Sequence, residues 1–274
     1  MSLKNHPFAV DARFDFSLVL TWALPTTTLQ PLLPPQLQLD TFDGRAAEAD
    51  GGSAPVGFIA IAMVQTRGLR PSRMPGIFGR DFFLIGTRVF ARCTVSSGQR
   101  LRGLYIVRSQ TNRASMRVLG YVFTRYRYEP INVDIVRNGG DIAVTAGAFH
   151  VDVDTSDARV EGEGEGDDGP EQSTSLLPPG SCFQTWKDAR RFAGPMPYTF
   201  STVKDPSQIL IVEGVRQQWR PRAVRVREAR VPFFAERGLD GAVLASAFIV
   251  ENVPYHWKAG RLEHWAPPDG PGPT

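Results

Sequence analysis

Alternation of apolar and polar residues with a period of two restricts the fold of this chain more than any other feature. Residues 131–136 read Ile-Asn-Val-Asp-Ile-Val, and an Asn-Gly-Gly turn separates them from a second run at 141–146. A period of two places the apolar side chains on one face of a β-strand. Two such runs joined by a turn rich in Gly and Asn are typical of a β-hairpin. We therefore expect a hairpin over 131–146.

Similar runs predict strands along most of the chain. They are bounded by glycine, proline or short polar clusters, which is how strands usually begin and end. The expected strands cover residues 56–64, 83–93, 101–108, 208–213, 223–231 and 244–253.

Helical patterns are few and short. The clearest covers residues 112–124, where Ala114, Val118, Tyr121 and Val122 share one face and Pro130 blocks any extension. Shorter helices are expected at 26–33, 181–190 and 233–237. Many strands with a few short helices predict a mainly β fold of the α+β class, built as a barrel or curved sheet.

The length of 274 residues suits one β-barrel domain over residues 1–265. Residues 161–168 read EGEGEGDD, which is acidic, rich in glycine and poor in apolar residues. We expect a mobile loop at 159–176 and a disordered tail at 266–274.

Charge and cysteine content exclude several classes of protein. The net charge is +3, and the arginines that dominate it are not interleaved with aromatic residues as in RNA-binding modules, so we expect no nucleic-acid partner. Cys93 and Cys182 are interpreted as reduced thiols, and the four histidines lack metal-ligand spacing. We expect neither metal nor cofactor.

No run of 18 apolar residues exists, and charged residues interrupt the N-terminal region where a secretion signal would need an apolar stretch. These observations predict a cytoplasmic protein with no membrane partner. Association of identical copies stays open.

Residues 32–45 read LLPPQLQLDTFDGR, and residues 68–71 read GLRP. With the strand that carries Arg88 and Arg92 and the helix after it, these segments resemble the DUF2071 (YqjF-like) family over about residues 15–150. That family is similar to acetoacetate decarboxylase. The resemblance implies a cone-shaped antiparallel β-barrel with an interior pocket and short flanking helices.

The resemblance does not carry over the decarboxylase reaction, which needs a lysine amine to form a Schiff base. Where the decarboxylases have a lysine pair after the helix, this chain reads Thr-Arg-Tyr-Arg-Tyr at 124–128, and arginine stays protonated. No glutamate occupies residues 83–85 either. Lys258 is the least implausible alternative nucleophile, although a solvated turn residue is the better interpretation.

The candidate ligand-binding residues follow from the same comparison. Arginine forks bind carboxylates and tyrosines add hydroxyl groups, so a pocket for an anion is one interpretation of the segment after the helix. The alternative is that its side chains decorate the outer face of a strand. Arg88 is a further candidate, as a cation on the inner face of the barrel. Tyr255 and His256 are also candidates, with His256 as a hydrogen-bonding group or a general base. The full set is Arg88, Arg125, Tyr126, Arg127, Tyr128, Tyr255 and His256.

Three functions remain open at this point. The first is a pocket for a small anionic metabolite, with or without a lyase or hydrolase step that uses no Schiff base. The second is a non-catalytic carrier or sensor with the same pocket. The third is a structural or partner-binding protein whose cavity is vestigial.

Overall fold

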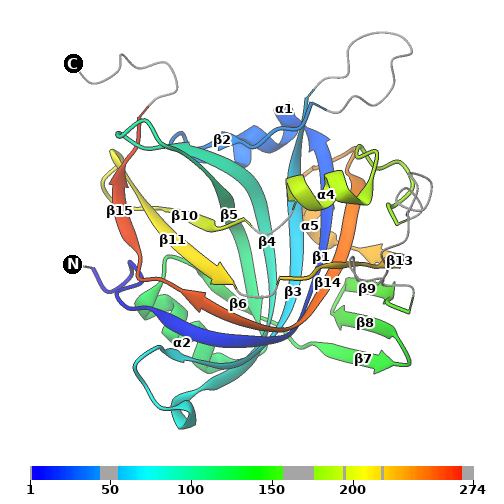
Figure 1. Ribbon diagram of the computed structural model, residues 1–274, viewed down its shortest axis with the longest axis horizontal. Helices are drawn as coiled ribbons and strands as arrows, with labels where there is room; N and C mark the ends of the chain where they lie inside the picture. Colours follow the sequence, from blue (N-terminus) through cyan, green and yellow to red (C-terminus); the bar gives the residue numbers. More distant parts are fainter. Residues whose placement is uncertain (1, 44–54, 157–175, 194–195, 217–218, 267–274) are drawn as a thin grey trace, which may run out of the picture.

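The computed structural model describes residues 2–43, 55–156, 176–193, 196–216 and 219–266. The loop expected at 159–176 and the tail expected at 266–274 fall almost wholly outside these residues. Long strands dominate the part that is described, and they curl into a ring (Figure 1). The mainly β fold with a few short helices is confirmed.

Seven strands close the ring. Each pairs with the next in the order β14, β1, β3, β4, β5, β10 and β11, and β11 pairs in turn with β14. Closure gives every strand of the ring two neighbours. The strands are β1 (Val10–Pro25), β3 (Val56–Pro71), β4 (Arg80–Thr94), β5 (Arg100–Thr111), β10 (Tyr198–Thr202), β11 (Gln208–Arg216) and β14 (Val243–Trp257).

The ring is mixed rather than wholly antiparallel. β10 pairs with β5 in the parallel sense, and so does the short β6 (Tyr128–Pro130). Parallel neighbours need a crossover connection, and between β5 and β6 this is the helix α2 (Ala114–Phe123). The expected antiparallel barrel is therefore corrected to a mixed one. Three further short strands pair with strands of the ring: β2 (Gln38–Leu39), β12 (Arg222–Ala223) and β15 (Arg261–His264).

A second, four-stranded sheet covers part of the outside of the ring. The predicted hairpin is confirmed, with Asn138 opposite Asp141 at its turn. Buried side chains of this sheet, such as Val144 and Val151, join the same hydrophobic cluster as Leu18 and Ile61 of the ring. The sheet consists of β7 (Asp134–Asn138), β8 (Asp141–Ala146), β9 (Phe149–Asp154) and β13 (Arg225–Arg230).

The strand expected at 223–231 is in fact divided between the two sheets. β12 pairs with β14 in the ring, whereas β13 pairs with β9 in the second sheet. Val224 lies between them and is buried. The chain therefore passes from one sheet to the other at the adjacent apolar residues Ala223 and Val224.

The two faces of β3 explain why the ring has both a packed outside and a hollow inside. Ile59, Ile61 and Met63 face the outer cluster, where the second sheet packs. Ala60 and Ala62 face inward. Side chains as small as alanine leave space at the centre of the ring that larger residues would fill.

Short helices close the ends of the ring. α2 lies at the lower end in Figure 1, and α4 (Trp186–Ala193) lies toward the upper end. The helices expected at 112–124, 26–33, 181–190 and 233–237 are all found, with shifted ends. The remaining helical segments are α1 (Thr26–Leu29), η1 (Gln30–Leu32), η2 (Gly76–Phe78) and α5 (Pro232–Glu236).

Candidate functional site

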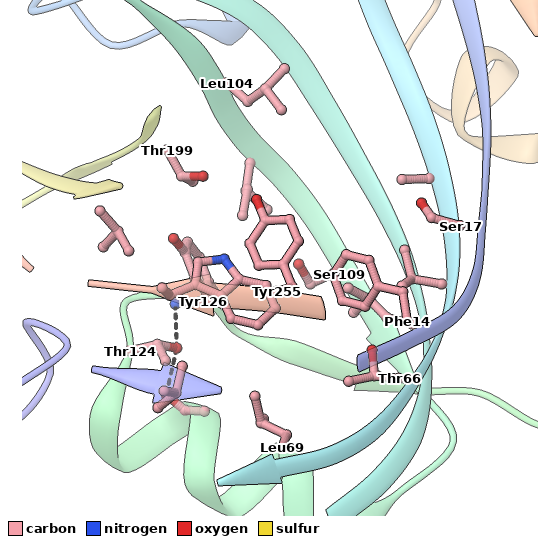
Figure 2. A pocket seen from close by; sticks show the side chains of 18 of the residues that line it. Phe14, Ser17, Thr66, Leu69, Leu104, Ser109, Thr124, Tyr126, Thr199 and Tyr255 are labelled. Carbon is pink, nitrogen blue, oxygen red and sulfur yellow. Dashed lines mark hydrogen bonds between the residues drawn. The ribbon is translucent and has the colours of Figure 1, made fainter. Parts of the chain in front are cut away.

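A cavity of about 280 Å³ lies inside the ring. Figure 2 shows side chains from different strands directed into this space, among them Phe14, Thr66, Leu104 and Thr199. The volume is at the lower end of the range for small-molecule pockets, which is about 300–1,000 Å³. The cavity therefore has room for a small metabolite.

Aromatic rings block one end of the ring. Phe42, Phe58, Phe183 and Phe192 contact one another with ring centroids 4.9–6.5 Å apart. Phe192 belongs to α4 and Phe183 lies just before it, so this helix positions two of the four rings of this aromatic plug. These rings fill that end of the ring with apolar side chains.

A buried carboxylate links neighbouring strands at the same end of the ring. The Asp40 side chain is 0% exposed and accepts hydrogen bonds from the Nε atoms of Arg92 and Arg102, on β4 and β5. Arg102 also donates to the carbonyl of Phe192 at 2.8 Å and lies over its ring. Arg92 and Arg102 are therefore structural cations with a partner.

Arg88 has no such partner among the residues that the structure describes. Its side chain lines the cavity and is half-buried. Among the residues that the structure describes, no group accepts a hydrogen bond from its Nε atom. Burial lowers the pKa of Arg88, yet a guanidinium keeps its charge in proteins. The result is an enclosed cation without a carboxylate.

Two local features position the Arg88 guanidinium. A Cβ atom at Gly86 would lie 3.2 Å from its Nε atom, so the missing side chain gives it room. The β4–β5 register also shifts between Thr87 and Arg88. Such a β-bulge redirects side chains and is frequent beside functional sites.

Tyr126 and Tyr128 bring phenol groups into the cavity from the segment after α2. Thr124 ends the helix: its hydroxyl donates to the carbonyl of Gly120 at 2.8 Å and accepts from the amide of Tyr126 at 3.1 Å. The Tyr128 ring lies where a Cβ atom at Gly120 would be, at 2.2 Å. Only glycine at position 120 lets the ring pack this closely on the helix.

One known protein family matches most of the chain. The model of the DUF2071 family, described as an uncharacterized conserved protein, matches residues 11–248. The chain belongs to the DUF2071 family. No curated protein sequence matches this DUF2071 chain.

Solved structures show the same fold. An acetoacetate decarboxylase-like enzyme from Sphingomonas wittichii RW1 has a TM-score of 0.53 and 11% identity, covering 97% of this DUF2071 chain and 95% of the enzyme. An acetoacetate decarboxylase from Legionella pneumophila has a TM-score of 0.52 and 11% identity, covering 93% and 88%. At this identity the likeness shows the fold alone.

A second arginine of the DUF2071 cavity is already engaged. Arg216 donates to the hydroxyl of Tyr255 at 3.1 Å and to the carbonyl of Met196, and its guanidinium lies 4.9 Å from the centre of the Trp219 ring. It therefore braces the wall, whereas Arg88 has an open donor.

His6 is a cavity residue that sequence reasoning missed. It lines the cavity beside Tyr126, with ring centroids 5.8 Å apart, and its Nε2 atom has no hydrogen-bond partner among the described residues. Burial lowers the pKa of His6 to about 4, so its imidazole is neutral at pH 7. No sequence pattern marked it, because it lies in a short mixed stretch with Lys4 and Asn5 before it.

The predicted site residues separate into two groups. Arg88, Tyr126, Tyr128 and Tyr255 line the cavity. The others lie elsewhere: Arg125 donates to the Oδ1 atom of Asn5, Arg127 is exposed, and His256 lies outside the cavity wall.

His256 belongs to a separate shallow surface depression. Its Nδ1 atom is 2.6 Å from Oδ1 of Asp11, a contact between the end of β14 and the start of β1. Both side chains are about one-third exposed. This pair lies beside the wall residue Tyr255 but does not face the cavity.

Three further expectations concern metals, thiols and membrane spans. The described residues hold no cluster of three or more side chains suited to a metal ion. Cys93 is buried and Cys182 half-buried, and both are free thiols. None of the described helices has the length and apolar character of a membrane span.

The buried phenols predict a pH effect on stability. Burial raises the pKa of Tyr126 to about 12 and that of Tyr128 further, against about 10 in an unfolded chain. Between pH 10 and 12 the unfolded state loses protons that the folded state keeps, so stability falls as pH rises, by up to about 1.4 kcal/mol per pH unit for each tyrosine. Phenolate absorbance should show fewer than the six tyrosines of the chain ionising before unfolding. Ionisation of all six near pH 10 in the folded protein would contradict the burial.

Proposed function

We propose that this DUF2071 protein binds a small organic anion inside its barrel, with the anionic group on Arg88. The supporting observation is the enclosed guanidinium whose Nε donor lacks an acceptor. An ionised group removed from water is costly unless it is paired. A bound carboxylate supplies the missing pair.

The chemistry of the wall favours an anion over other ligands. None of the residues that line the cavity is acidic, and three are arginines: Arg70, Arg88 and Arg216. A guanidinium presents parallel N–H donors that match the two oxygens of a carboxylate. The phenols of Tyr126 and Tyr128 are protonated at neutral pH and add donors of their own.

The rest of the ligand is expected to be apolar. Phe14, Phe82, Phe90 and Phe248 line the remaining wall, together with aliphatic side chains. Because the cavity holds about 280 Å³, a compact aliphatic or aromatic carboxylic acid fits this combination of charge, surface and size.

Binding should be lost when Arg88 is replaced. With hexanoate and benzoate as probes, we expect Arg88→Met to weaken affinity about 10- to 100-fold, because a charge-assisted hydrogen bond contributes about 1.5–3 kcal/mol. Titration calorimetry and ligand-induced shifts in melting temperature measure this.

The matched control is Arg127→Met, which removes an exposed arginine between Tyr126 and Tyr128 and should leave binding unchanged. Hexanol and benzyl alcohol test the need for charge. Failure of every carboxylate to bind the wild-type protein, or equal weakening in both variants, would argue against the site.

Decarboxylation through a Schiff base is not part of this proposal. The lysines are Lys4, Lys187, Lys204 and Lys258, and the wall residues include none of them. Lys258 is 53% exposed and pairs with Glu213 at 2.8 Å. Neutral His6, with its pKa near 4, is a weak proton acceptor at pH 7, which favours a carrier or sensor over general-base catalysis.

Borohydride reduction in the presence of acetoacetate or pyruvate tests this point. The intact mass should stay unchanged, since an exposed lysine held in an ion pair is a poor nucleophile. A reduced adduct on any lysine, lost again in Lys258→Met or another lysine variant, would restore a decarboxylase-like mechanism.

A further inference from the structure

Exposed apolar side chains gather at the end of the ring that α2 covers. The described residues expose eleven large apolar side chains, and seven of them come from three short segments: the N-terminus, the turn between β3 and β4, and α2. Ile77 is 87% exposed, Tyr121 66% and Val118 63%. We call this set the entrance patch: Leu3, Met74, Ile77, Phe78, Val118, Leu119 and Tyr121.

The three segments meet in space. The amide of His6 donates to the carbonyl of Phe123, and the Lys4 amine lies 4.1 Å from the centre of the Tyr121 ring. Figure 1 shows α2 and the β3–β4 turn together at the lower end of the molecule. Leu119 is exposed and also lines the cavity. Leu69, at the base of the turn, lines the cavity too. The patch therefore borders the cavity.

The three segments that form the patch carry charge of one sign only. Residues 2–10, 71–80 and 112–125 contain no Asp or Glu. The neighbouring acids Asp11 and Asp81 are held by His256 and by Arg67. The cations of the three segments are Lys4, Arg73, Arg80, Arg113, Arg117 and Arg125.

From this combination we infer that the entrance patch docks on an anionic lipid bilayer. Apolar side chains that project beside basic residues enter the headgroup region of a membrane while the basic residues attract its negative surface. A second copy of the chain fits less well, because a two-fold interface would bring the same cations face to face. The docked face would bring the cavity next to the lipid, from which an apolar acid can enter.

This inference rests on surface residues and not on Arg88. The expectation from the sequence that the protein has no membrane partner came from the absence of an apolar run, which concerns spanning and not peripheral contact. The Arg88→Met protein should therefore bind vesicles like the wild type, which separates the two proposals experimentally.

Co-sedimentation of the full chain with vesicles tests the docking. Binding to phosphatidylcholine vesicles containing about one-third phosphatidylglycerol should exceed binding to pure phosphatidylcholine at least about 10-fold, and should fall in high salt. Equal binding to both vesicle types, or binding to neither, overturns the proposal.

Matched variants identify the face. Ile77→Glu and Val118→Glu should each reduce vesicle binding about 10-fold or more, because a charged side chain cannot enter the apolar layer. Val136→Glu changes a valine that is 54% exposed on the second sheet and should have no effect. Thermal unfolding confirms that each variant is folded, since all three positions are exposed.

Charge reversal gives an independent readout. Arg73→Glu with Arg117→Glu should abolish the preference for anionic vesicles, whereas Arg100→Glu with Arg220→Glu, the same change in net charge at exposed positions outside the patch, should preserve most of it. Equal losses in both pairs overturn the docking face. Self-association of the wild type that Ile77→Glu abolishes, without vesicle binding, assigns the patch to a second copy and also overturns it.

Discussion

Replacing Arg88 by methionine is expected to stabilise the ligand-free protein by about 1–3 kcal/mol. The guanidinium lies inside the ring, its Nε atom has no acceptor among the described residues, and its wall neighbours are mostly apolar. A buried charge without a partner opposes folding, and replacing buried charges by apolar side chains of similar volume often stabilises by this amount. Methionine keeps the length of the side chain and fills irregular space.

Urea unfolding followed by circular dichroism measures the change in the free energy of unfolding. Arg127→Met should change it by less than about 0.5 kcal/mol, as is usual for an exposed residue. Destabilisation of Arg88→Met by more than about 1 kcal/mol would mean that the cation is already paired in the free protein, and the argument for an external anion would fail.

The two predictions for Arg88 point in opposite directions: its removal weakens ligand binding but strengthens the fold. A residue kept at a cost in stability is expected where function requires it. An arginine with a purely structural role would show loss of stability without any change in the affinity for hexanoate.

The strand pattern was the part of this fold that the sequence predicted best. The runs at 56–64, 83–93 and 101–108 lie within β3, β4 and β5, and the hairpin at 131–146 is present. β1 was not predicted, although it pairs along its length with β3 and β14. Residues 10–18 alternate apolar and polar side chains, so the signal for this strand was present and was overlooked. The alternation stops at Leu18 and Val19, which pack against opposite faces of the sheet.

The sequence predicted only part of the site, because contacts with residues far away in the sequence decide which side chains face the cavity. Arg88 and Arg92 have the same side-chain parity on one strand, and both are candidates for the inner face. Asp40, far away in sequence, pairs with Arg92 and leaves Arg88 without a carboxylate. Similarly, Arg125 turns to Asn5 while Tyr126 faces the cavity. Local periodicity cannot report such pairings.

Asp40→Asn is expected to destabilise the protein by about 3 kcal/mol, the largest single effect that we predict. The Asp40 carboxylate is 0% exposed and accepts from both Arg92 and Arg102, which are each 35% exposed. Breaking a buried ion pair costs about 3–5 kcal/mol, and the partial exposure of the two arginines places this case at the lower end. An asparagine offers one acceptor oxygen and turns an N–H donor toward a cation.

The melting temperature should fall by about 2–4 °C for each kcal/mol lost, and Asp134→Asn, at an exposed carboxylate of the second sheet, should leave it unchanged. Asp40→Asn combined with Arg92→Met and Arg102→Met should lose less than the single change, because no unpaired cation remains. A loss below about 1 kcal/mol in Asp40→Asn would show that the two arginines find solvent as readily as a carboxylate. The plug of Phe183 and Phe192 would then have to hold this end of the ring closed by apolar packing alone.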